Sequence, residues 1–165
     1  LQVEFNPSKV KEYRLVGYEN RILNNEDFED DEKDAGELGA GAVVTAFYEI
    51  VPADGTETQD FRYRDTNAKP SDELMYLKIR YKDPDGTESK LIEEPIGSII
   101  NTNPSENFKF ASAAAQLGMI LNDSEYKGSA TLENVIKQAQ SGVGKDEFGF
   151  KHEFIQLVDL IKYIN

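Results

Sequence analysis

Apolar and polar residues alternate with a period of two in several stretches of the first hundred residues. Residues 1–5 alternate from the first position, and residues 74–82 do so most cleanly, with apolar side chains at every second place. Such a period is typical of a half-buried strand. An Asp-Pro-Asp-Gly turn at 83–86 follows, so we expect residues 88–96 to return as the second strand of a hairpin.

The strongest strand signal in the chain is the run 42–51, which is rich in apolar, β-branched and aromatic residues. Because apolar residues fall on both of its faces, we interpret it as a central strand. Residues 10–18 predict another strand. We therefore expect an antiparallel sheet or sandwich over residues 1–100.

In the rest of the chain the apolar period becomes that of a helix. The sequence Asn-Pro-Ser-Glu at 103–106 is a helix start signal, and Asn103 is the expected cap. Thr131 is expected to cap a second helix, and Gly142 to end it.

A third helix is expected near the end of the chain, with a single apolar stripe along it. The members of this stripe are Phe150, Phe154, Leu157, Val158 and Ile161. The whole pattern predicts an α+β fold, with an antiparallel β-sheet or sandwich in the N-terminal half followed by about three α-helices. We divide the chain into a β-rich subdomain, residues 1–100, and a helical subdomain, residues 101–165.

Composition narrows the range of partners. The 165 residues carry a formal net charge of -13 and include no cysteine. A charge this negative repels phosphate backbones, so we expect no nucleic acid partner. Without cysteine the chain has no disulfides, thiolate metal sites or cysteine nucleophiles. No run of 18 or more apolar residues occurs, so the sequence predicts no membrane span in this fragment.

An acidic, glycine-rich crossing separates the strands expected at 10–18 and 42–51. We expect at least one of its glycines to have a positive φ or to be packed too closely for a Cβ atom, because three glycines before a strong strand are otherwise costly. The crossing also contains a candidate structural or interaction loop, made of Glu19, Asn20, Arg21, Asp27, Asp34, Gly36, Gly39 and Gly41.

The acidic residues of the crossing raise the question of a metal site, since hard cations bind several carboxylate oxygens. The residues concerned are Glu26, Asp27, Glu29, Asp30, Asp31 and Asp34. They lack the order of an EF-hand calcium loop, so a solvated acidic loop is the favoured interpretation. The only histidine, His152, supports neither a histidine metal cluster nor a Ser-His-Asp triad. We expect no catalytic residue, no metal ligand and no cofactor.

Two further features have both a functional and a structural interpretation. Residues 142–145, Gly-Val-Gly-Lys, are similar to part of a phosphate-binding loop, but the first glycine and the Ser or Thr are missing and a helix precedes them. We interpret them as a helix terminus. Tyrosines on the expected strands could offer an aromatic surface to a glycan or a protein, although packing is the favoured role. They are Tyr13, Tyr18, Tyr48, Tyr63, Tyr76 and Tyr81.

Several longer motifs resemble one protein family. They lie at residues 13–21 (YRLVGYENR), 27–28 (DF), 34–41 (DAGELGAG), 44–49 (VTAFYE) and 124–128 (SEYKG). With the aromatic last helix they span nearly the whole chain, and motifs of this length are specific. The family is the uncharacterised C-terminal domain that follows a von Willebrand factor type A domain in exported bacterial proteins.

The resemblance implies a location and a neighbouring domain but no activity, because the family has no established activity. It implies an exported protein, periplasmic or at the cell surface. The partner would be the N-terminal von Willebrand factor type A domain of the same chain, or another envelope protein. The Asp-x-Ser-x-Ser metal-adhesion motif of that neighbouring domain does not occur here. Ala42 stands where such sequences often have histidine, which argues against a catalytic histidine there.

Two classes of function remain. The favoured hypothesis is a non-catalytic structural or protein-interaction module attached to a von Willebrand factor type A domain in a bacterial cell-envelope protein. The alternative is a carboxylate-dependent enzyme or a glycan-binding module, which a pocket joining two buried carboxyl groups of raised pKa would favour. Since residues 1–5 alternate from the start, we interpret the chain as a domain excised from a longer protein. We expect an exposed sheet edge or apolar patch that the neighbouring domain would cover, or crystal and solution dimers that cover it instead.

Overall fold

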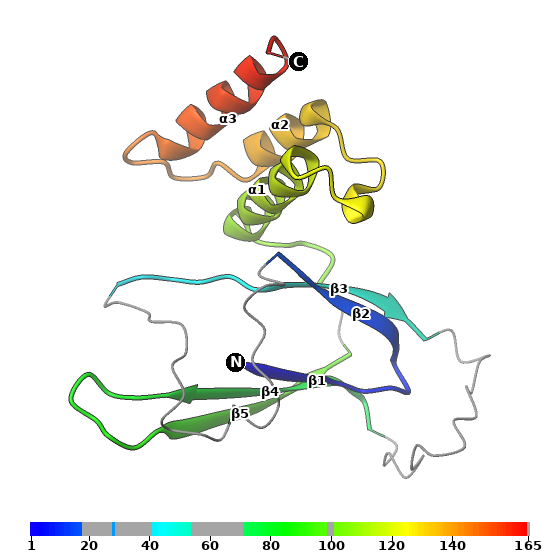
Figure 1. The fold of residues 1–165 in the computed structure, drawn as a ribbon, viewed down its shortest axis with the longest axis vertical. Helices are drawn as coiled ribbons and strands as arrows, with labels where there is room; N and C mark the ends of the chain where they lie inside the picture. The colour runs from blue at the N-terminus through cyan, green and yellow to red at the C-terminus, as the bar shows by residue number, and fades with distance from the viewer. Residues whose placement is uncertain (18–27, 29–40, 54–70, 99–100, 165) are drawn as a thin grey trace. The chain divides into compact units, whose positions relative to one another are not determined.

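The computed structural model describes residues 1–17, 28, 41–53, 71–98 and 101–164. The chain divides into two units, Leu1–Ile100 and Asn101–Asn165, which we call the β unit and the helical unit (Figure 1). Antiparallel strands form the first unit and three α-helices the second, so the predicted α+β fold is confirmed.

One sheet of the β unit has three strands: β1 (Gln2–Phe5), β4 (Glu73–Tyr81) and β5 (Lys90–Gly97). The order is β1-β4-β5, and both pairings are antiparallel. In the turn between β4 and β5, the N–H of Gly86 donates to the carbonyl oxygen of Asp83 at 2.9 Å. The predicted hairpin is therefore confirmed, and β4 is the central strand of this sheet.

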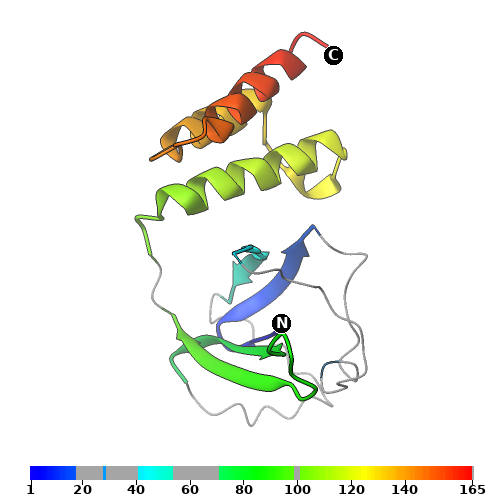
Figure 2. The same cartoon turned by 90° about the vertical axis from the view of Figure 1, so that its left-hand side faces the viewer.

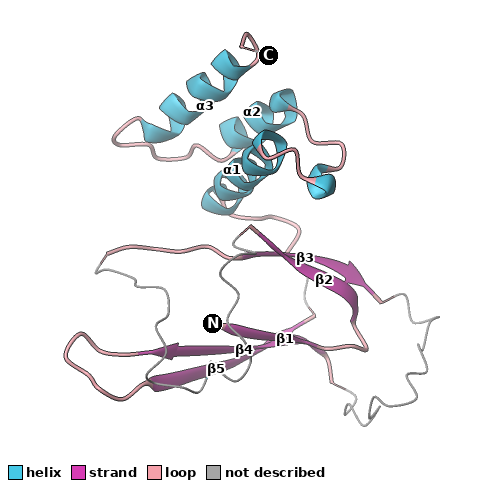
Figure 3. Ribbon diagram, viewed as in Figure 1, coloured by secondary structure: helices cyan, strands magenta, loops and turns pink. Residues whose placement is uncertain are grey.

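The second sheet consists of β2 (Val10–Val16) and β3 (Phe47–Pro52), paired antiparallel (Figure 3). The prediction of a central strand over 42–51 is wrong in two respects. The strand starts five residues later, so that Val43 and Val44 are 87% and 64% exposed. Among the described strands, moreover, β3 pairs with β2 alone.

The late start of β3 follows from the end of its partner. The ladder stops at the pair Val16–Phe47, and Gly17 then takes a φ of +75, a conformation that carries the chain out of the strand. An apolar run has strand propensity at every position, but a strand forms only where a partner is available. For residues 42–46, β2 offers none.

An aromatic cluster joins the two sheets, which Figures 1 and 2 draw as separate layers of the β unit. The Phe5 ring of β1 lies 4.4 Å from the Tyr13 ring of β2 and 5.5 Å from the Tyr48 ring of β3, measured between centroids. Val10 of β2 is buried. Rings from three strands thus hold the N-terminal strand against the second sheet.

The helical unit contains α1 (Glu106–Leu121), a short 3-10 helix η3 (Glu125–Lys127), α2 (Leu132–Ser141) and α3 (Phe150–Ile161) (Figure 2). Its core consists of fully buried residues from the three α-helices: Ala113, Val135, Ala139 and Val158. Small side chains at these positions let α1 and α2 approach each other closely.

The helix caps are partly as predicted. Thr131 caps α2, because its Oγ1 accepts the N–H of Asn134 at 3.2 Å. Helix α1, however, is capped by Ser105, whose Oγ accepts the N–H of Phe108 at 3.2 Å, so the predicted cap Asn103 is wrong. Serine is as good a cap as asparagine, and the position next to the first helical residue decides between them.

Helix α3 buries only part of the apolar stripe predicted from the sequence. Val158 is fully buried, and Phe154 and Ile155 pack against the core. Phe150 and Leu157 were assigned to the same stripe, but they are 69% and 55% exposed. At 3.6 residues per turn these two lie at the edge of the stripe farthest from Val158.

Candidate functional site

The loop predicted from the sequence lies almost wholly outside the described residues. Gly41 is described, and its φ of +81 confirms the expectation of a positive φ in the glycine-rich crossing. The other predicted residues lie outside the described part: Glu19, Asn20, Arg21, Asp27, Asp34, Gly36 and Gly39. So do all the carboxylates of the candidate cation site. An interaction role for the loop stays a prediction.

Phe28, which lies between the predicted loop residues Asp27 and Asp34, is also described, and it contacts β4. The guanidinium of Arg80 lies over the Phe28 ring, 5.8 Å from its centroid. The Nη1 of Arg80 donates to Ser89 Oγ at 2.7 Å, while its buried Nε has no hydrogen-bond partner in the described part of the chain. Because an aromatic face attracts a guanidinium, this contact fixes Phe28 on the sheet. No sequence pattern marks the pair.

The first candidate surface is the side of α3 that the core does not use. Six large apolar side chains there and at the two ends of the helix are more than half exposed: Phe148, Phe150, Leu157, Leu160, Tyr163 and Ile164. We call this set the α3 outer face. The rings of Phe148 and Phe150 lie 5.9 Å apart. So many exposed apolar side chains on and next to one short helix are a mark of an interaction surface.

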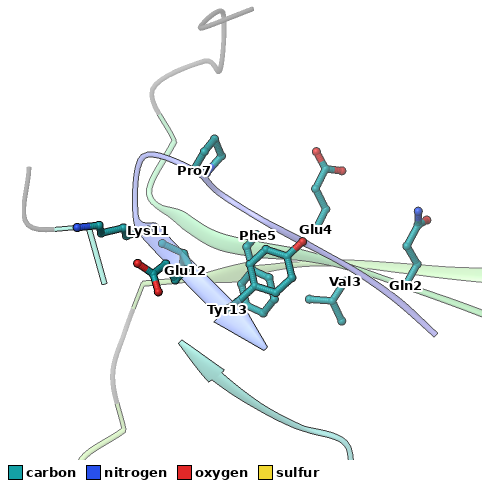
Figure 4. Close-up of a pocket in the computed structure, with 9 residues that line it drawn as sticks. Gln2, Val3, Glu4, Phe5, Pro7, Lys11, Glu12 and Tyr13 are labelled. Atoms are coloured by element: carbon teal, nitrogen blue, oxygen red, sulfur yellow. The ribbon is translucent and has the colours of Figure 1, made fainter. Parts of the chain in front are cut away.

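The second candidate surface is an open cavity of about 740 Å³ between β1 and β2, which we call the β1–β2 groove (Figure 4). The rings of Phe5 and Tyr13 lie together in its middle, and the side chains of Gln2 and Glu4 project to another side of β1. The lining residues come from both strands and the turn between them: Gln2, Val3, Glu4, Phe5, Pro7, Val10, Lys11, Glu12 and Tyr13.

The backbone of β1 is open along this groove. Among the described strands β1 pairs with β4 alone, and the N–H of Asn6, next to the strand, donates to the carbonyl oxygen of Leu74 in β4 at 2.9 Å. Main-chain groups alternate sides along an antiparallel strand, so the even-numbered residues of β1 face β4. The N–H and C=O groups of Val3 and Phe5 therefore face the open edge.

The tyrosines of the expected strands divide into two groups. Tyr48 is half-buried. Its pKa is raised mainly by burial and to a smaller extent by the neighbouring Tyr13. Packing is thus the role of Tyr48, as predicted. Tyr13 is 59% exposed although its ring contacts Phe5, so one of its faces is available in the β1–β2 groove. Tyr18 and Tyr63 lie outside the described residues.

His152 lies on the surface of α3, and its partner is Asp146, with His152 Nδ1 2.7 Å from Asp146 Oδ2. The same carboxylate accepts the backbone N–H groups of Lys151 at 3.3 Å and His152 at 3.0 Å. Desolvation works to raise the pKa of Asp146, but these hydrogen bonds outweigh it and leave the pKa below its ordinary value. Asp146 thus caps α3, and the pair is structural. No sequence pattern reveals this cap, because Asp146 stands three residues before the helix's own N-cap, Gly149.

Lys151 is a second structural residue that the sequence did not reveal. Its Nζ donates to the carbonyl oxygens of Gly142 at 3.2 Å and Val143 at 2.9 Å, and to Asn107 Oδ1 at 3.1 Å. It also lies 5.3 Å from the centroid of the Phe110 ring. A single ammonium group therefore ties α3 to the end of α2 and the start of α1.

The described residues offer little to an acid–base mechanism. None of their polar or charged residues is buried as a whole, and no three of their His, Asp or Glu residues gather where a metal ion would bind. Hydrogen bonding to Lys127 lowers the pKa of Asp123, and hydrogen bonding to its own N–H lowers that of Glu133.

None of the helices in the described part is both long and apolar enough to cross a membrane.

Comparisons with known proteins give one family. The family model described as "Uncharacterized protein YfbK, C-terminal" matches residues 1–164. Over 164 residues the chain is 40% identical to a protein of Escherichia coli (strain K12) described as "Uncharacterized protein YfbK". The match covers 96% of this chain but only 28% of that relative. No solved structure matches the chain.

The match extends over both units, from the first strand to the end of α3. It confirms, at the level of the family, the resemblance drawn from the sequence motifs. The chain therefore belongs to the family described as "Uncharacterized protein YfbK, C-terminal".

Proposed function

We propose that this chain is a non-catalytic protein-interaction module attached to a von Willebrand factor type A domain in a bacterial cell-envelope protein. The α3 outer face carries the proposal, since its six large apolar side chains are each more than half exposed. Fully covering a large apolar side chain is worth about 1.5–3 kcal/mol. A partner that covered even part of this face would gain several such contributions.

The charge distribution supports an apolar contact through the helical unit. Residues 1–100 contain 23 acidic and 12 basic side chains, a net charge of -11, whereas residues 101–165 contain eight acidic and six basic ones, a net charge of -2. Long-range repulsion therefore comes mainly from the β unit. The nearly neutral helical unit can approach a partner of either sign.

The partner we propose is the rest of the same polypeptide. The chain spans 28% of the length of its Escherichia coli relative, which leaves room in that protein for other domains. A docking partner on the same chain has a high effective concentration, so a modest apolar face suffices for a stable contact. The motif resemblance supplies the neighbour's identity, a von Willebrand factor type A domain, and the location in the envelope.

A carboxylate-dependent enzyme or glycan-binding module is the second class of function. Two buried carboxyl groups beside a pocket would support this class. The β1–β2 groove has Glu4 and Glu12 in its lining, but both residues are exposed. No described observation favours this class over an interaction module.

The test is a titration of this chain with the separately produced von Willebrand factor type A region of the longer protein, followed by calorimetry. Leu157→Ser together with Leu160→Ser should weaken binding at least about tenfold, because both side chains lie on the α3 outer face. The matched control is Leu121→Ser, at the end of α1, where the leucine is 58% exposed. We expect the control to bind like the parent chain.

Three results would overturn the proposal. The first is no binding of the parent chain at concentrations up to about 1 mM, the effective concentration that a short flexible linker would give. The second is equal weakening by both variants. The third is self-association of the parent chain that the paired leucine variant abolishes, which would make a second copy the occupant. The envelope location has its own test, since recovery of the longer protein only from the cytoplasmic fraction of its host would contradict it.

A further inference from the structure

We propose that the β1–β2 groove binds an extended polypeptide segment by strand addition to the open edge of β1, and that this segment alternates basic and apolar side chains. The inference concerns the β unit and does not depend on the α3 outer face. It rests on main-chain groups of β1 that have no partner among the described strands, on the aromatic floor of the groove and on the negative charge beside it.

The edge of β1 supplies the hydrogen bonds. The N–H and C=O groups of Val3 and Phe5 face away from β4, as the hydrogen bond from Asn6 to Leu74 shows by alternation. An incoming strand can pair with both residues. Edge strands that keep such groups available are templates for another strand, and recognition by strand addition uses them.

The groove supplies the space and the apolar contacts. Its volume of about 740 Å³ lies within the range of roughly 300–1,000 Å³ that is typical of ligand pockets. This volume suits the side chains of a short extended segment and is too small for a folded domain. The Tyr13 ring, 59% exposed, and the Phe5 ring beneath it offer an aromatic surface for every second side chain of the segment.

Charge decides which segment fits. Two glutamates, Glu4 and Glu12, and one lysine, Lys11, line the groove, which leaves one more negative than positive charge there. Both glutamates are exposed, and no ion pair of either carboxylate is found within the described part of the chain. The β unit as a whole has a net charge of -11. A segment with basic residues at alternate positions is attracted to this surface, whereas the same edge of a second copy would bring like charges together.

The experiment uses the full 165-residue chain and an acetylated nine-residue peptide of alternating lysine and valine, followed by amide-resolved NMR. We expect hydrogen exchange at the Val3 and Phe5 amides to slow at least about tenfold on binding, because these groups gain partners. A peptide of alternating glutamate and valine should not bind. Two further peptides are methylated at alternate amide nitrogens, one at the odd and one at the even positions. The peptide whose methyl groups replace the N–H groups that face β1 should not bind, and the other should bind like the unmethylated peptide.

Two variants, Glu4→Gln and Glu12→Gln, test the role of charge. Each should weaken binding of the lysine peptide roughly two- to fivefold. The matched control is Glu88→Gln, an exposed glutamate in the connection between β4 and β5, which should leave the affinity unchanged. Three outcomes overturn the inference. They are binding without protection of Val3 and Phe5, equal loss of affinity in all three variants, and protection of the β1 edge by self-association of the chain without peptide.

Discussion

Gly142 is the described glycine of the helical unit that lies closest to backbone atoms of another helix. It ends α2 against α1, and a Cβ atom there would lie 2.5 Å from the backbone nitrogen of Phe110 and 2.6 Å from the carbonyl oxygen of Glu106. Both neighbours are backbone atoms of a helix and cannot turn aside as a side chain would. The glycine was predicted from the sequence as a helix terminus, but this close packing could not be, because it depends on which helix lies opposite.

Gly142→Ala should therefore destabilise the chain by about 1–3 kcal/mol, the usual cost of forcing a methyl group into a packed interior. Gly118 is the matched control, since it lies inside α1 with nothing within 4 Å of an added Cβ. Gly118→Ala should stabilise by about 0.5–1 kcal/mol through helix propensity alone. Urea unfolding followed by circular dichroism measures both. Equal effects of the two substitutions would refute the close contact.

Asp146 gives the helical unit a dependence on pH. Its pKa in the folded chain lies below the ordinary value of 3.8, despite the opposing effect of desolvation, because His152 and two backbone N–H groups donate to it. A lowered pKa means that folding favours the ionised carboxylate. This stabilisation is present above the ordinary pKa and is lost as the pH falls through the lower, folded-state value.

Asp146→Asn should consequently lower the thermal midpoint at pH 7, and the difference from the parent chain should shrink as the pH is lowered below 4. Thermal melts from pH 7 to pH 2.5 measure this. Glu147→Gln is the control at the neighbouring position, where the carboxylate pairs with the exposed Lys145 at 3.2 Å. If the thermal midpoints of Asp146→Asn and the parent chain differ by the same amount from pH 7 to pH 2.5, the stabilisation by Asp146 does not depend on its charge.

At the scale of elements, the sequence predicted what local pattern determines. The hairpin of β4 and β5, the Thr131 cap and the order of strands before helices are confirmed because each depends on neighbours in sequence. The errors concern partners far apart in sequence. The run 42–51 has strand propensity throughout, yet only the part opposite β2 forms β3. The stripe of α3 is only partly buried, since a pattern alone cannot tell which part of an apolar side faces a core.

Lys151 shows how an element is held by a residue that patterns do not reveal. Lys151→Met keeps the length of the side chain but removes the three hydrogen bonds of Nζ to the ends of α1 and α2. We expect a loss of about 1–3 kcal/mol in the free energy of unfolding. The control Lys145→Met alters a lysine whose side chain is 86% exposed and should change stability little. Equal unfolding free energies of the two variants would exclude this role for Lys151.

At the scale of the whole molecule, the sequence motifs led to the family but not to a site. Most residues of the candidate loop, and the tyrosines 18 and 63, lie outside the described part of the chain. The two surfaces that the structure offers instead, the α3 outer face and the β1–β2 groove, were not predicted residue by residue. Both are defined by what is left uncovered, which depends on the packing of every other element.

The proposed function requires that the rest of the longer protein cover the α3 outer face. Hydroxyl-radical footprinting measures this, because the label reports the exposure of individual side chains. We expect labelling of Phe148, Phe150, Leu157 and Leu160 to fall several-fold when the von Willebrand factor type A domain is joined to this chain, while labelling of Leu121 stays the same. Equal labelling of the α3 outer face in the two proteins would show that the neighbouring domain does not cover it.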